Sequence, residues 1–216
     1  IHCADGVSLH DCTWQDLQVD SHGIPIYIGS HFSHLMQRIT CRSLTDCFVI
    51  FGGNTVMLDN CYGSHWAEDG GTAVAGAASF RIANTATMIT CNGVEGLEYW
   101  LVAGGKIDDP YFPVTSYPDI IMIGCNLEGW TKAGIKTIIE GTLNVKECKF
   151  QYTHATNAFD AWIISDSGCL STIVESCTFN SQGGAQTYGG TDSVVAANGN
   201  PNLILVGQAS SLYQYY

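Results

Sequence analysis

Acidic side chains near the middle of this 216-residue sequence are its best candidates for chemistry. Glu68 lies seven residues after Cys61, and Glu98 lies seven residues after Cys91. Two carboxyl groups that flank one bond can serve as acid and base in glycoside hydrolysis, about 5–5.5 Å apart for retention or about 6.5–9.5 Å apart for inversion. The shared offset predicts such a pair if Cys61 and Cys91 are equivalent positions. The candidate catalytic residues are Glu98, Glu68, Asp69 and Glu95.

A second register gives Glu98 different partners. Asp46, Glu98 and Asp160 each immediately precede a short apolar run that reads as a strand. The two registers disagree about the partner of Glu98 but both include Glu98, which is therefore the first candidate. The alternative for any one of these acids is a solvated residue in a turn.

Aromatic and charged side chains near these acids are candidates for holding a sugar chain, because flat rings cover the apolar faces of sugars. Trp66 and Trp130 each lie five residues after a cysteine, on expected loops, and we expect both to be exposed. Trp100 has an inward, core-forming alternative, which is also our expectation for Trp162. The candidate substrate-binding residues are Trp66, Tyr99, Trp100, Trp130, Arg81, Asp108 and Asp109.

Composition excludes several other functions. The chain has 8 Lys and Arg against 20 Asp and Glu, and its net charge of −12 would repel nucleic acid and anionic membranes. No stretch approaches the ~20 apolar residues that a membrane-spanning helix needs. Residues 1–6 lack the basic start and apolar run of a signal peptide. The scattered histidines and the glycine-rich stretches match no metal or phosphate motif, so no metal and no cofactor are expected.

Cysteines mark the elements that must position these residues. Seven of the ten cysteines end a short run in which apolar residues recur with period two, although Arg38 interrupts the pattern before Cys41. Cysteine is a small, readily buried side chain, so we expect these thiols to be reduced and packed in the core. The seven are Cys12, Cys41, Cys61, Cys91, Cys125, Cys148 and Cys177.

These cysteines recur every 20 to 34 residues, and an eighth copy places Gln208 at the cysteine position. A repeat of this length predicts a solenoid. The interval from Cys41 to Cys61 is too short for a propeller blade but fits one coil of three short strands. We therefore expect an all-β parallel β-helix of about eight coils over residues 1–208, with an end segment at 209–216. Both ends look unfinished, which indicates a fragment of a longer protein or ends covered by other subunits.

The pattern Val-x-x-Cys-x-Phe at residues 145–150 and 174–179 resembles the single-stranded right-handed β-helices of the pectate-lyase-like superfamily. Within it, the acidic, glycine-rich coils look most like bacteriophage tailspikes. That resemblance implies a homotrimer, located on the virion or outside cells, that binds and cleaves a bacterial capsule or O-antigen polysaccharide, usually by hydrolysis. The polygalacturonase-type motifs Asn-Thr-Asp and Gly-His-Gly are absent from this sequence. Two alternatives stay open: a lyase, in which Arg81 would neutralise a uronate, and a glycan-binding adhesin without catalysis.

Overall fold

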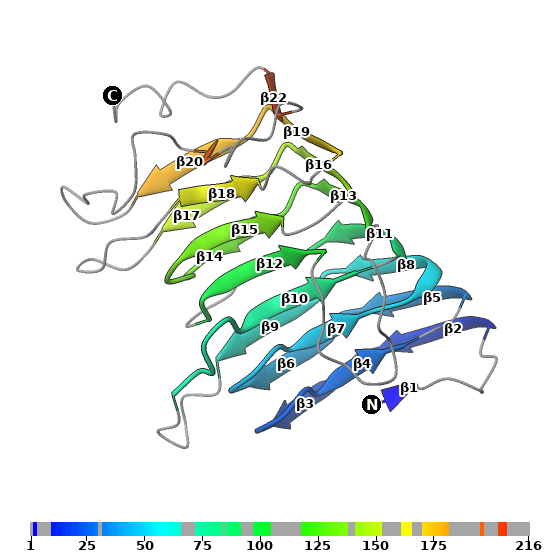
Figure 1. Ribbon diagram of the computed structural model, residues 1–216. Helices are drawn as coiled ribbons and strands as arrows, with labels where there is room; N and C mark the ends of the chain where they lie inside the picture. The colour runs from blue at the N-terminus through cyan, green and yellow to red at the C-terminus, as the bar shows by residue number, and fades with distance from the viewer. Residues whose placement is uncertain are drawn as a thin grey trace.

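The structure is a computed structural model, and it describes residues 2–3, 10–29, 32–65, 72–83, 85–91, 97–104, 118–137, 141–152, 161–165, 170–181, 195–196 and 203–206. Over these ranges the chain forms only strands and turns, without any helix. Every pair of neighbouring strands in this part is parallel, and the strands stack in rows (Figure 1). The expectation of an all-β chain built from parallel strands is confirmed.

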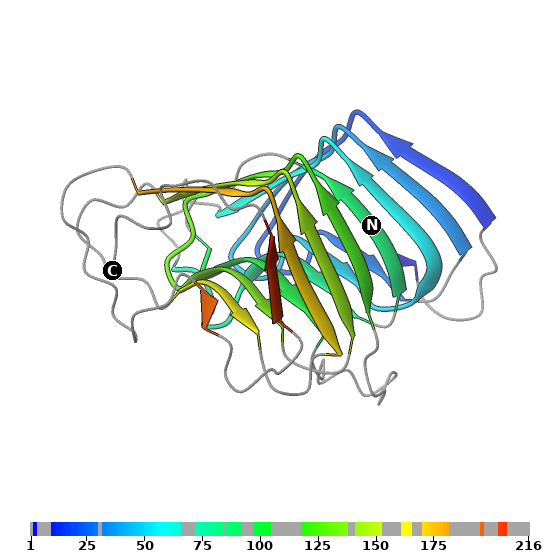
Figure 2. The ribbon, with the colours of Figure 1, turned by 90° about the horizontal axis from the view of Figure 1, so that it is seen from above.

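Two eight-stranded sheets, here called A and B, make up most of the molecule, and two three-stranded sheets, C and D, complete it. The chain runs from sheet A to sheet B, then in most passes to C or D, and back to A (Figure 2). Sheet A contains β1 (His2–Cys3), β4 (Ile26–Ile28), β7 (Phe48–Ile50), β10 (Ala78–Ile82), β12 (Tyr99–Ala103), β15 (Ala133–Thr137), β18 (Ala161–Ser165) and β21 (Val195–Ala196).

The other three sheets follow the same order along the chain. Sheet B contains β2 (His10–Gln15), β5 (Phe32–Gln37), β8 (Gly53–Asp59), β11 (Thr85–Thr90), β13 (Asp119–Ile123), β16 (Thr142–Lys146), β19 (Ser171–Glu175) and β22 (Leu203–Val206). Sheet C contains β3 (Gln18–Ser21), β6 (Thr40–Ser43) and β9 (Tyr62–His65). Sheet D contains β14 (Asn126–Glu128), β17 (Lys149–Tyr152) and β20 (Thr178–Ser181).

A repeated corner turns the chain out of sheet B. One residue at the corner has a positive φ, and its N–H donates a hydrogen bond to the next strand of sheet B, as Asn60 does to the Thr90 carbonyl at 2.8 Å. The next residue points into the core. The corner residues with positive φ are Asp16, Arg38, Asn60, Gly124, Glu147 and Ser176.

The register corrects the cysteine repeat at its N-terminal end. The main chain makes Ile39, not Cys41, equivalent to Cys61, and Leu17 is equivalent to Ile39. Cys12 lies within β2, five residues before Leu17. The inward position after the corner accepts any compact apolar side chain, so a repeat defined by cysteine alone misses the leucine and the isoleucine. Gln208 lies outside the described residues.

The core consists of stacked thiols and aromatic rings. Cys61, Cys91, Cys125, Cys148 and Cys177 are at most 1% exposed, and all eight cysteines whose side chains the structure describes are free thiols. The Cys61 N–H donates to the Cys91 sulfur at 3.3 Å, and the Cys91 N–H donates to the Cys125 sulfur at 3.5 Å. The expectation of buried, reduced thiols is confirmed for these five and for Cys41, whereas Cys12 is a free thiol that is only partly buried.

Aromatic rings from successive strands stack beside the thiols. Phe48 lies on Phe80 with ring centroids 5.0 Å apart, and Phe80 contacts Trp100 at 4.7 Å. Trp162 is fully buried, as expected, and packs edge-on against Trp130 at 5.5 Å. Each pass of the chain therefore places its large side chains on those of the pass before.

Candidate active site

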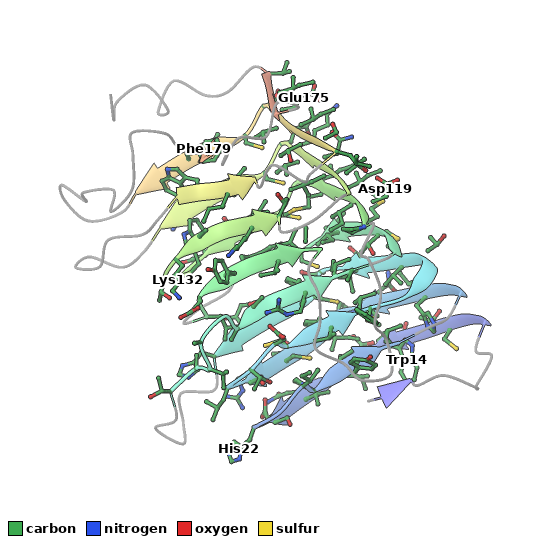
Figure 3. The ribbon with its side chains drawn as sticks, in the orientation of Figure 1. Trp14, His22, Asp119, Lys132, Glu175 and Phe179 are labelled. Carbon is green, nitrogen blue, oxygen red and sulfur yellow. The ribbon has the colours of Figure 1, made fainter. Side chains whose placement is uncertain are left out.

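Glu98 lies at the corner where the chain enters β12. Its Oε2 accepts a hydrogen bond from the Gly76 N–H at 2.6 Å and lies 2.9 Å from the Nζ of Lys132. Lys132 reaches it because β12 and β15 are neighbours, with Tyr99 paired to Ala133. The Glu98 side chain is 18% exposed and that of Lys132 is 44% exposed, and Figure 3 shows Lys132 at one edge of the molecule. Both donors bind a carboxylate, which suits Glu98 as a proton acceptor or a nucleophile.

Asp46 forms a second ion pair beside Glu98. Arg81 donates to both Asp46 oxygens, at 2.7 and 2.9 Å, and the Ala78 N–H donates to Asp46 at 2.8 Å. Arg81 also donates to the Gly76 carbonyl at 2.7 Å. Gly76 therefore connects the two ion pairs, its carbonyl contacting one and its N–H the other. Its φ of +84° is a conformation that glycine adopts without strain.

The separation of the two acids follows from the sheet. Asp46 precedes β7 and Glu98 precedes β12, and β10 lies between these two strands. Two strand spacings amount to roughly 9.6 Å, near the upper end of the inverting range. Both Asp46 oxygens already accept from Arg81, so Asp46 acts here as the anchor of Arg81. The prediction that grouped Asp46, Glu98 and Asp160, because each immediately precedes a strand, thus places Asp46 and Glu98 in one network. Asp160 lies outside the described residues.

Tyr99 follows Glu98 in the chain and begins β12. Its ring lies under the ammonium of Lys136, with the Nζ 5.6 Å from the ring centroid, and only 8% of Tyr99 is exposed. Lys136 is half-buried on β15, in register with Val102. A cation over a tyrosine face is an attractive contact. Lys132 therefore contacts Glu98 directly, whereas Lys136 contacts Tyr99, the next residue in the chain.

Two tryptophans expected at the site are core residues instead. Trp130 and Trp100 are both 0% exposed, so the predicted exposure of Trp130 and a sugar-stacking role for either ring are wrong. Trp130 follows β14 and packs on Phe150 and Trp162, at 6.2 and 5.5 Å. The prediction took the fifth residue after Cys125 as an exposed loop position, but in the structure this residue, Trp130, faces the core.

Other predicted site residues lie outside the described part of the chain. They are Trp66, Glu68, Asp69, Glu95, Asp108 and Asp109. Cys61 and Cys91 are equivalent in the structure, which was the assumption behind pairing Glu68 with Glu98. The pairing itself stays a prediction.

Sequence reasoning missed Gly76, Lys132 and Lys136. Lys132 is 34 positions after Glu98, and only the pairing of β12 with β15 joins them. No local pattern signals such a contact. The sequence does show that four of the five lysines lie between residues 132 and 149, which indicates a basic region but not its partner.

The described ranges offer neither a metal-binding cluster nor a membrane-spanning helix. These ranges contain no group of three or more His, Cys, Asp or Glu side chains that could hold a metal ion. They also contain no helix with the length and hydrophobicity to span a membrane. Comparison of the chain with protein-family models, with curated proteins and with solved structures gave no match.

Proposed function

We propose that this chain is a segment of a tailspike-type depolymerase, wound as a right-handed parallel β-helix, that binds and hydrolyses a bacterial surface polysaccharide. The order of the strands supports the winding, because sheets A and B each take one strand from every successive pass of the chain. The resemblance of residues 145–150 and 174–179 to such coils supports the assignment to tailspikes. The homotrimer and the location on the virion belong to the same proposal.

The observation that carries the proposal is the partly exposed carboxylate of Glu98, which the Gly76 N–H and the Lys132 ammonium hold at the start of β12. Hydrolysis needs one ionised carboxylate and one carboxylic acid at the bond. In our proposal Glu98 is the ionised group, which takes a proton from water or attacks the sugar. Glu68, Asp69 or Glu95 protonates the leaving oxygen.

The lyase alternative is weaker, because the Arg81 guanidinium already binds Asp46 and the Gly76 carbonyl. Binding without cleavage is the second candidate. It is favoured by the mutual neutralisation of the charges at this corner, where Asp46 pairs with Arg81 and Glu98 pairs with Lys132.

The test is Glu98→Gln, assayed against a panel of capsular and O-antigen polysaccharides. We expect the unmodified chain to release reducing ends and shorten one polymer, and Glu98→Gln to lose at least ~100-fold of that rate while still binding. Glu147→Gln is the matched control, because Glu147 is an exposed acid at a corner of the sheet B edge.

Each result has a distinct meaning. Undiminished cleavage by Glu98→Gln contradicts the role of Glu98. An unsaturated, ultraviolet-absorbing product identifies a lyase. Binding without any shortening across the panel identifies the adhesin.

A further inference from the structure

The outward face of sheet B carries a row of apolar side chains, which Asn144 interrupts between Ile121 and Ile173. Strand registers place six apolar side chains along it, one from each of six strands, and a threonine and an asparagine fill the two other positions. Ile121 is 42% exposed and Ile204 is 49% exposed. The six are Leu35, Met57, Met88, Ile121, Ile173 and Ile204.

On β7 and β12, the outward apolar residues of sheet A are buried, unlike those of sheet B. Val49 and Val102 alternate with inward residues on β7 and β12, yet each is only 1% exposed. Outward valines of sheet A are thus covered within the chain, whereas outward isoleucines of sheet B are not. A contiguous exposed apolar patch on a protein surface generally marks an interaction site.

Charges on the sheet B face are few and already partnered. Its described side chains include one base and three acids, a small part of the chain's net charge of −12. Asp59 accepts a hydrogen bond from Gln37 at 3.0 Å, and Lys146 lies 3.7 Å from Glu175. Contact between two such faces leaves these bonds intact and needs no opposite charge. A strongly basic partner would find little to bind here.

The size of the face matches what self-association needs. Eight strands of about five residues cover roughly 34 by 17 Å, or about 600 Å² of flat area. Side chains corrugate this area, which brings the accessible surface close to the ~800 Å² per partner of a standard interface. The site corner is on the opposite side, since Figure 3 shows Lys132 at one edge of the molecule and Asp119 and Glu175 at the other.

We propose that the outward face of sheet B is a contact surface between neighbouring copies of this chain, with the row around Met88 and Ile121 at its centre. This inference does not depend on the catalytic proposal. The chain's large negative charge opposes association, and salt screens that repulsion while apolar contact persists. Self-association should therefore strengthen as salt is raised.

The test is sedimentation of the chain and its variants over a range of concentration and salt. We expect a dimer or trimer whose fraction rises with both, and at least ~10-fold weaker association for Ile121→Lys and for the milder Ile121→Thr. Val74→Lys is the matched control, because Val74 is 53% exposed and lies outside sheet B. It should associate like the unmodified chain, and circular dichroism should show all variants folded.

Oxidation of methionines locates the interface independently. Met57 and Met88 should form sulfoxide more slowly at high than at low protein concentration, whereas the fully buried Met122 should stay slow at both. A chain that sediments as a monomer throughout overturns the proposal. So does equal loss of association in Val74→Lys, or unchanged association in both Ile121 variants.

Discussion

Thiols in the core of this protein are chemically quiet because of where they lie. Burial is the main cause that raises the pKa of the Cys41 and Cys47 thiols well above their usual range. The hydrogen bond with Cys125 raises the pKa of Cys148 to about 12. A neutral, enclosed thiol is a poor nucleophile. We therefore expect the five buried thiols with a raised pKa to ignore a thiol reagent at neutral pH until the chain is unfolded; they are Cys41, Cys47, Cys91, Cys148 and Cys177.

The same shifts predict alkaline loss of stability. A thiol with a raised pKa in the folded state stays protonated there while the unfolded chain ionises above about pH 9. Each such thiol then lowers the free energy of unfolding by up to ~1.4 kcal/mol per pH unit. Urea unfolding measured at increasing pH should show this fall, and Cys47→Ala should make it shallower. An equal slope in Cys47→Ala would contradict the burial of that thiol.

Gly76 gives a prediction at the candidate site. Its φ of +84° disfavours any side chain, although a Cβ there would touch nothing within 4 Å. Gly76→Ala should therefore cost about 1–2 kcal/mol in unfolding free energy through the backbone alone. Gly23→Ala is the control, since its Cβ also meets nothing and its φ is ordinary. Equal stability of the two variants would show that the corner is not held in this conformation.

At the scale of elements, the sequence predicted the strands well and their equivalence only in part. Period-two apolar runs ending at Cys61, Cys91 and later cysteines predicted sheet B and the corner after it correctly. Before Cys61 the repeat was misplaced, because Ile39 fills the inward position and Cys41 lies two residues later. Arg38 indicated this error in the sequence, because the repeat expects an inward apolar residue three positions before the cysteine. In the structure Arg38 is the corner residue.

The corners make a paired stability prediction. Glu147 has a φ of +54°, which a glycine adopts without strain, so Glu147→Gly should stabilise the chain by about 0.5–1 kcal/mol. Gly124 occupies the equivalent corner with a φ of +62° and open space around it, so Gly124→Ala should destabilise by a similar amount. Thermal unfolding of both variants measures the difference. Shifts of the same sign in both would argue against equivalent corners.

At the scale of the whole molecule, contacts between successive passes of the chain determine the site. Glu98 was identifiable because it precedes a strand, but its partners Lys132 and Gly76 lie just before the neighbouring strands β15 and β10 of sheet A. Trp130 was misassigned because the sequence alone does not show which positions after β14 face the core; that requires the pairing of β14 with its neighbouring strand β17. Local patterns predict strands and corners, whereas the partners of a side chain depend on the register between passes.

The most direct measurement is a structure of the Glu98→Gln chain with the polysaccharide that the unmodified chain shortens. We predict that the polymer crosses the starts of β10, β12 and β15, with a glycosidic oxygen within hydrogen-bonding distance of residue 98. A polymer bound only elsewhere, for example along the outward face of sheet B, would contradict the assignment of this corner as the site of cleavage.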